Sequence, residues 1–166
     1  MSVFRVMIIG GPGSGKTTLG GQLSHQLDLP VFSVDDAVWD SNGNLRSVKT
    51  IDALVRAKIA EERWIIEGGN TRTYNERALR SDLVIWLNPP LWLRFIRVLR
   101  RDGPKFRLLL WTLKYDRTFG IKDRAILSFA EHTTNCFEVR TEDDAKDILR
   151  ELGVGPDIGT ATAKGS

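Results

Sequence analysis

Short apolar runs alternate with amphipathic segments along the chain, and this alternation predicts the order of its strands and helices. The apolar runs lie at 3–9, 31–34, 64–69, 82–87 and 136–139. They are too short for helices of ordinary length and are bounded by turn residues, which is typical of strands. Because each run is apolar at successive positions, we expect strands that are buried on both faces of a parallel sheet.

The segments between these runs have helical periodicity. They predict helices over 16–27, 50–62, 73–79, 91–113 with an interruption at 102–104, and 141–152. Thr50 and Asp52 are expected to open the second helix, and Thr141 with Asp144 forms a capping pattern for the last. Strands that alternate with helices predict an α/β fold, a three-layer sandwich around a five-stranded parallel sheet.

A glycine-rich loop, GGPGSGKTT, joins the first predicted strand to the first predicted helix. It matches G-x-x-x-x-G-K-[ST], the phosphate-binding motif of P-loop NTPases, in the strand–loop–helix context that this motif requires. The glycines let backbone N–H groups curl around a phosphate at the positive end of the helix. Lys16 is expected to reach the β- and γ-phosphates, and the Thr17 hydroxyl to bind Mg²⁺. The residues predicted to bind the nucleotide are Gly10, Gly11, Gly13, Ser14, Gly15, Lys16, Thr17 and Thr18.

The remaining chain favours ATP as the nucleotide. Guanine-selective GTPases carry an N-K-x-D element after a later strand, and no such string occurs here. We therefore expect adenine, or weak discrimination between bases, and take ATP and Mg²⁺ as the predicted cofactors.

Length and composition indicate one ordinary cytoplasmic domain. The chain has 166 residues, one cysteine (Cys136), and no apolar run near the roughly 20 residues that span a bilayer. A lone cysteine allows no internal disulfide, which fits a reducing compartment. The N-terminal apolar stretch is too short for a signal peptide. We expect the domain to cover 1–152 and the tail 153–166, which has little to bury, to be disordered.

Positive charge is concentrated in one segment. Residues 94–124 contain ten cations and three aspartates, so this segment carries +7 in a chain of net +3. Such a block faces nucleotide phosphates as a lid, binds a polyanion, or is simply a solvated basic helix. In the first case Arg97 and Arg101, four residues apart on one helical face, would neutralise charge on the transferred phosphoryl group.

Three stretches carry a resemblance to a known family. The phosphate loop resembles that of adenylate kinases and related small-molecule kinases. Two further stretches resemble patterns of the bacterial topology modulation (FlaR-like) proteins, which belong to the same P-loop kinase group. Residues 30–39 resemble P-V-x-x-x-D-x-x-x-W, and residues 63–90 resemble a segment that begins W-I-I-D-G-N-x-x-R-T. The chain departs from that family in having Glu67-Gly68-Gly69 in place of Asp-Gly-Asn, and in its short basic lid. The resemblance implies a kinase fold.

Two acids follow predicted strands at the edge where open α/β sheets bind ligands. The resemblance implies that Asp35 holds the hydroxyl of a phosphoryl acceptor or orients Mg²⁺; the alternative for Asp35 is a helix N-cap. Glu67 follows an apolar strand as a Walker-B acid does, and it is predicted to hold Mg²⁺ through water. The alternative for Glu67 is a carboxylate that caps a turn.

Further residues are candidates for the acceptor site. The resemblance implies that Arg72 grips a phosphate or carboxylate of the acceptor, with Arg77 assisting, because the guanidinium fork suits such oxyanions. Either arginine could instead form an ion pair, for instance with Asp82 or Glu76. Gly68 would let the acceptor approach the backbone, and Trp39 would form a wall of the pocket. The other four tryptophans are predicted to pack in the interior.

The preferred function is an ATP-dependent kinase that transfers the γ-phosphoryl group to a small hydroxylated metabolite or a nucleotide. One alternative is a nucleic-acid-linked ATPase, for which the chain offers no helix-turn-helix, zinc-finger or RNA-binding pattern. The other is a nucleotide-binding switch with negligible turnover. The predicted partners are ATP and a small acceptor, without membrane or nucleic acid, in a monomer or homodimer.

Overall fold

Five parallel strands form the centre of the protein. The computed structural model describes residues 3–152. The strands are β1 (Arg5–Gly10), β2 (Val31–Ser33), β3 (Trp64–Glu67), β4 (Leu83–Leu87) and β5 (Asn135–Val139). They pair in the order β2-β3-β1-β4-β5, and every pairing is parallel. This confirms the predicted five-stranded parallel sheet.

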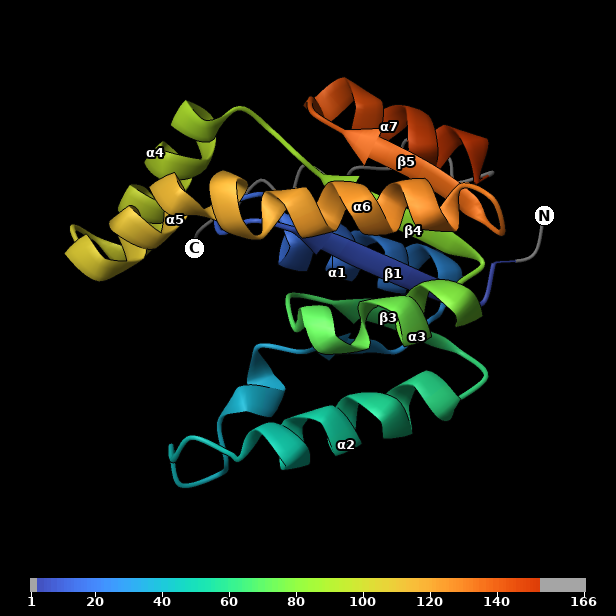
Figure 1. Ribbon diagram of the computed structural model, residues 1–166. Helices are drawn as coiled ribbons and strands as arrows, with labels where there is room; N and C mark the ends of the chain where they lie inside the picture. The colour runs from blue at the N-terminus through green and yellow to red at the C-terminus, as the bar shows by residue number, and fades with distance from the viewer. Residues whose placement is uncertain (1–2, 153–166) are drawn as a thin grey trace, which may run out of the picture.

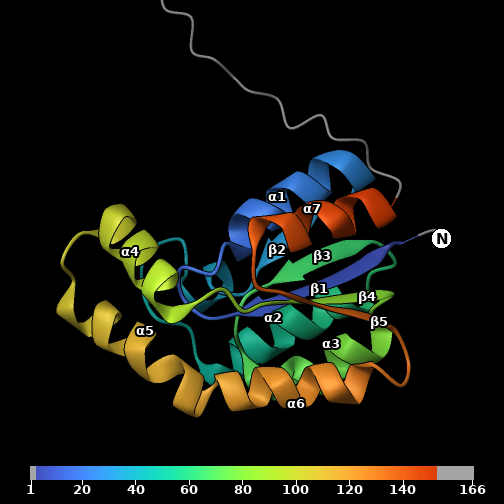
Figure 2. The same cartoon turned by 90° about the horizontal axis from the view of Figure 1, so that it is seen from above.

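Helices cover both faces of the sheet and complete the predicted three layers. The helices α1 (Lys16–Leu27) and α7 (Glu142–Glu151) lie on one face, and α2 (Val48–Ala60), α3 (Tyr74–Arg80) and α6 (Gly120–Ala130) lie on the other (Figures 1 and 2). The core accordingly has two parts. On β1, Val6 and Ile8 pack toward α1 and α7, whereas Met7 and Ile9 pack on the opposite face. This alternation follows from the period of two in a strand.

Two helices of the basic segment extend beyond the carboxyl ends of the strands. They are α4 (Leu91–Asp102) and α5 (Phe106–Thr118), seen at the left in Figure 2. The break between them is the one predicted at 102–104, where Gly103 adopts a positive φ of 71°. Helix α6 was not predicted from the sequence. Only Phe119 separates it from α5, so no run of loop residues marks where it begins.

Several boundaries differ from the predictions by one to three residues. Helix α2 begins at Val48 because Ser47, and not Thr50, is its N-cap: the Ser47 side chain accepts a hydrogen bond from the Thr50 N–H. Strand β3 ends at Glu67, since Gly68 has a φ of 109° that strand geometry excludes. Helix α7 carries the predicted capping box of Thr141 and Asp144.

The tryptophans divide into two groups. Trp64 and Trp86 are buried in the core, as predicted. The same prediction is wrong for Trp92 and Trp111, because α4 and α5 lie outside the three layers and leave these side chains 65% and 41% exposed. No helix of residues 3–152 is both long enough and apolar enough to cross a membrane. The tail 153–166, predicted to be disordered, lies outside the described residues.

Candidate active site

The phosphate loop lies between β1 and α1, pressed against its neighbours. Gly10 has a φ of 142°, and a Cβ there would come 2.4 Å from the carbonyl oxygen of Leu87 on β4. Gly13 has a φ of 71°, and a Cβ there would come 2.5 Å from the carbonyl oxygen of Arg94 on α4. Only glycine fits both the backbone geometry and the space at these two positions, so a side chain at either would distort the phosphate loop.

Lys16 lies folded against the loop that it follows. Its Nζ donates hydrogen bonds to the carbonyl oxygens of Gly10, at 2.9 Å, and Gly11, at 3.1 Å. Burial lowers the pKa of Lys16, and the negative charges of Asp35, Glu67 and Asp123 act in the opposite direction. The ammonium group is therefore held by the loop, and three carboxylates from different parts of the chain act on it electrostatically.

Glu67 and Thr17 meet at the end of β3. The Thr17 hydroxyl donates to Glu67 Oε1 at 3.2 Å, and the Glu67 side chain is only 2% exposed. Glu67 Oε2 is buried without a hydrogen-bond partner in the described structure. A buried carboxylate oxygen with no donor, next to a threonine hydroxyl, fits Mg²⁺ held directly by Thr17 and through water by Glu67. Residues 3–152 contain no group of three or more metal-binding side chains, so phosphates and water would complete the coordination.

A pocket of about 450 Å³ opens on one side of the phosphate loop. It lies between the start of α1, the start of α4 and the turn from β5 into α7. Gly15 and Thr18 line it from the first of these elements, Leu93 and Arg97 from the second, and Thr141 from the third. Apolar side chains beside a phosphate loop suit a planar nucleotide base.

The two predicted lid arginines differ in position. Arg97 lies at the loop: its Nη1 is 3.5 Å from the carbonyl oxygen of Ser14, and its Nη2 is 3.5 Å from Glu142 of α7. Arg101 is one turn further along α4, exposed, and pairs with Asp102 at 2.8 Å. The structure thus brings Arg97 into contact with the phosphate loop, whereas Arg101 is exposed on α4 and acts on the loop through its charge, which lowers the pKa of Lys16.

The ends of β2 and β3 form what we call the acceptor side, defined by Asp35, Trp39, Gly68 and Arg72. Asp35 precedes the 3₁₀ turn η1 (Asp36–Val38), and its carboxylate makes no capping hydrogen bond. Asp35 is thus the N-cap residue of η1 by position, as the alternative predicted, but its side chain does not cap the turn. A Cβ on Gly68 would lie 3.6 Å from the Asp35 N–H, so the two strand ends are in contact. Trp39 is 55% exposed and lies further along the same loop.

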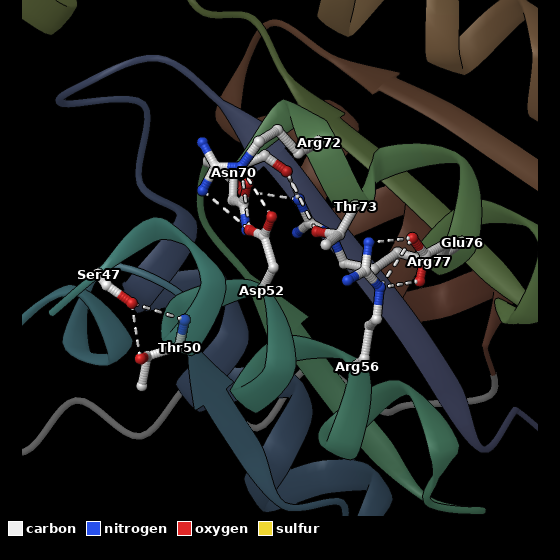
Figure 3. A network of polar contacts seen from close by, with 10 residues as sticks. Ser47, Thr50, Asp52, Arg56, Asn70, Arg72, Thr73, Glu76 and Arg77 are labelled. Carbon is white, nitrogen blue, oxygen red and sulfur yellow. Dashed lines mark hydrogen bonds and ion pairs between the residues drawn. The ribbon is translucent and has the colours of Figure 1, made fainter.

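The two predicted acceptor arginines are both engaged within the protein (Figure 3). Arg72, in the 3₁₀ turn η2 (Thr71–Thr73), makes three hydrogen bonds of 2.9–3.0 Å to the carboxylate of Asp52 on α2. Arg77 is fully buried and binds backbone carbonyl oxygens. The ion-pair alternative is thus correct for Arg72, although its partner is neither Asp82 nor Glu76.

Two buried charged residues close to the site were missed by the sequence analysis. Asp123 of α6 is fully buried and accepts hydrogen bonds from the hydroxyls of Tyr74, at 2.8 Å, and Tyr115, at 2.9 Å. Arg94 of α4 is 2% exposed and donates to Asp116 of α5 at 2.6 Å. Both belong to the basic segment, where counting charges treats every charged residue as a surface residue. The only nearby signal for burial of Asp123 is Tyr115, eight residues earlier in the sequence.

The fold and the phosphate loop together place this protein in the class of P-loop NTPases with a five-stranded parallel sheet. Among solved structures it resembles shikimate kinases. That of Aquifex aeolicus aligns with a TM-score of 0.63 and 22% identity over 90% of this chain and 96% of the other. That of Acinetobacter baumannii, solved in complex with shikimate, aligns with a TM-score of 0.62 and 17% identity over 91% and 94%.

One curated relative matches at the level of sequence. It is a shikimate kinase of Rhodococcus jostii (strain RHA1), 30% identical over 99 residues. The match covers 50% of this chain and 58% of that protein, so the chain spans little more than half the length of its relative. No family model matches the chain. The adenylate-kinase-like P-loop fold is therefore confirmed, and the finer likeness to the topology modulation family is not.

Proposed function

We propose that this protein is an ATP-dependent phosphotransferase that acts on a small hydroxylated metabolite. The observation that carries the proposal is the arrangement around the phosphate loop: a pocket lined by Gly15 and Thr18 opens on one side, and the charge of Asp35, after β2, acts on Lys16. A kinase needs this division, because donor and acceptor must reach one phosphoryl group from opposite sides. The similarity to shikimate kinases supports the same reaction class.

ATP would bind with its base in the pocket between Leu93 and Thr141 and its phosphates in the loop. Lys16 would release the carbonyl oxygens of Gly10 and Gly11 and bind the β- and γ-phosphates, exchanging two neutral acceptors for a charged one. Thr17 and Glu67 would hold Mg²⁺, which supplies charge neutralisation to the phosphates when bound.

The acceptor hydroxyl would approach from Asp35. Its oxygen forms a bond to the γ-phosphorus as the bond from that phosphorus to the bridging oxygen breaks, and ADP leaves with the electron pair. The hydroxyl proton passes to the Asp35 carboxylate and from there to water. Since phosphoryl transfer depends mostly on position and charge, Asp35 acts chiefly by aligning the hydroxyl.

Arg97 would supply positive charge to the transferred group from the other side of the loop, since it already lies beside Ser14. Arg101 would contribute less, because its guanidinium is exposed and paired with Asp102 and reaches Lys16 only through its charge. Arg97→Ala should therefore lower kcat more than Arg101→Ala does.

The first experiment measures ADP release from Mg-ATP with a panel of hydroxylated acceptors. We expect one class of acceptor to raise ADP release well above the rate of the protein alone, and Asp35→Ala to remove this increase while ATP affinity stays unchanged. Glu61→Ala is the control, since Glu61 is an exposed carboxylate at the end of α2 and is not part of the acceptor side. ATP binding without stimulation by any acceptor would contradict the proposal and favour a nucleotide-dependent switch.

A further inference from the structure

The arginines around the acceptor side carry information about the acceptor itself. A site that binds an acidic metabolite needs a guanidinium or ammonium group with free N–H donors that point to the ligand. If the protein is the phosphotransferase proposed above, the hydrogen bonds of its arginines, which Figure 3 shows for Arg72 and Arg77, indicate what charge the acceptor bears.

Arg77 is used to hold the loop that follows β3. Its Nη1 donates to the carbonyl oxygen of Gly68 at 3.1 Å, and its Nη2 donates to those of Gly69 at 2.6 Å and Asn70 at 3.2 Å. The side chain is fully buried and lies 4.7 Å from the ring centre of Tyr74. Burial lowers the pKa of Arg77 to about 10, which still leaves it charged at neutral pH. Both Nη groups of this guanidinium are therefore engaged by the loop, and its Nε is buried without a hydrogen-bond partner in the described structure.

Arg72 is neutralised by Asp52. The guanidinium makes a two-pronged contact with the carboxylate, through Nε and Nη2, and Asn70 donates a further hydrogen bond of 2.9 Å to the same oxygen. The Asp52 side chain is only 13% exposed, so the pair is shielded on the carboxylate side. The charge that would attract an acid is balanced within the protein.

Arg46 is the third arginine on this side, in the loop after η1. Its Nη1 donates to the backbone carbonyl oxygens of Asp36, Ala37 and Trp39, and so closes the loop that carries Asp35. In contrast, the exposed carboxylates of Asp35 and Asp36 accept no hydrogen bond and form no ion pair within residues 3–152. The side chains left free at the acceptor side are thus acids.

We propose that the acceptor is an uncharged polyol, and that the protein discriminates against acceptors bearing a carboxylate or phosphate. Hydroxyl groups donate to free carboxylates, whereas an anionic acceptor would meet Asp35 and Asp36 while Arg72 is neutralised by Asp52 and Arg46 and Arg77 are bound to backbone carbonyl oxygens. Like charges brought together without compensation are a common source of specificity. The same arrangement excludes nucleoside monophosphates.

Arg124 is the strongest rival source of positive charge, since it has no carboxylate partner within the described structure. Its guanidinium lies 5.8 Å from the ring centre of Trp86, and it lines a separate pocket with Asn88, Pro89 and Arg140. These residues follow β4 and β5, whereas Asp35 and Gly68 follow β2 and β3, with β1 between the two pairs. Arg124 therefore belongs to the far side of the sheet edge from Asp35.

The test uses pairs of acceptors that differ in one charged group: glycerol and glycerate, glucitol and gluconate, and the methyl ester of shikimate and shikimate. With Mg-ATP, we expect the neutral member of an accepted pair to have a kcat/KM about tenfold higher than the acid. If the acid is used as well as or better than the neutral member, the inference is overturned while the phosphotransferase function stands. If no pair stimulates ADP release, the proposed function itself fails.

A variant makes the test independent of pocket shape. Asp52→Asn removes the charge that neutralises Arg72 without changing the size of the side chain. We expect kcat/KM for the acid to rise about tenfold through a lower KM, with the value for the neutral member unchanged. The control is Glu76→Gln, which frees Arg56 one turn further along α2 in the same network. Equal changes for both members of the pair would mean that Asp52 has only a structural role.

Discussion

At the scale of single residues, the site divides into side chains that the motifs predicted and partners that they did not. Lys16, Thr17 and Glu67 could be predicted because the phosphate loop and the end of a buried strand are local patterns. The partner of Arg72 could not, since Asp52 lies 20 residues away and no short pattern links the two. The same holds for Asp123, which meets Tyr74 across 49 residues of sequence.

Arg77 gives a prediction at this scale. Arg77→Met keeps most of the buried volume but leaves the carbonyl oxygens of Gly68, Gly69 and Asn70 without their donors. We expect the free energy of unfolding to fall by about 2–4 kcal/mol, since each buried polar group left unpaired costs about 1–3 kcal/mol. Urea unfolding of the variant measures this. The control is Arg80→Met, which removes an exposed arginine of the same helix; a similar loss in both would contradict the assigned role.

At the scale of elements, the basic segment is tied to the phosphate loop. Arg94 of α4 reaches so close to Gly11 that a Cβ there would lie 2.2 Å from its Nη1, and the ring of Tyr115 of α5 packs at the same glycine. Asp116, next to Tyr115, neutralises Arg94. The predicted lid of 94–124 is therefore two helices and the start of a third. The charge of this segment suggested a lid, whereas the contacts of Arg94 with Asp116 and with the phosphate loop show what holds α5 in place.

Asp116→Asn tests this tie. The substitution leaves the buried guanidinium of Arg94 without a charged partner, and a hydrogen bond to a charged group contributes about 1.5–3 kcal/mol. Because the Asp116 side chain is about half exposed, we expect a loss of about 1–2 kcal/mol in the free energy of unfolding. The comparison is Asp102→Asn, which breaks the exposed pair with Arg101 and should cost under about 1 kcal/mol. Indistinguishable losses would show that Arg94 needs no partner.

At the scale of the whole molecule, one carboxylate joins two helices on one face of the sheet to α5, which lies beyond the sheet. Asp123 of α6 is hydrogen-bonded to Tyr74, at the start of α3, and to Tyr115 of α5. The alternation of apolar runs with helical segments in the sequence predicted the three layers, because apolar runs of this kind mark strands that helices cover on both faces. It could not predict how α5 and α6 dock, since that depends on this buried polar cluster.

The cluster makes stability depend on pH. Burial raises the pKa of Asp123, although the two tyrosine hydroxyls and the charges of Lys16 and Arg77 lower it. A raised pKa in the folded state means that stability is full below the ordinary aspartate pKa of about 4 and is lost as the pH rises through the raised value. The free energy of unfolding of Asp123→Asn should therefore improve relative to the wild type as the pH rises from about 4 through the raised pKa of Asp123. A difference that is constant over this range in urea titrations would contradict this.

The distribution of tryptophans described above has an optical consequence. Trp39 is exposed beside Asp35, Trp111 is partly exposed on α5 against Tyr115 and Phe119, and Trp64 and Trp86 are shielded in the core. Emission from the shielded pair is insensitive to solvent, whereas that from Trp39 and Trp111 responds to polarity and quenchers. The protein thus carries exposed tryptophans in two places: Trp39 on the acceptor side, and Trp92 and Trp111 on the basic helices. Filling of the acceptor side and displacement of the basic helices should therefore each change the emission without any added dye.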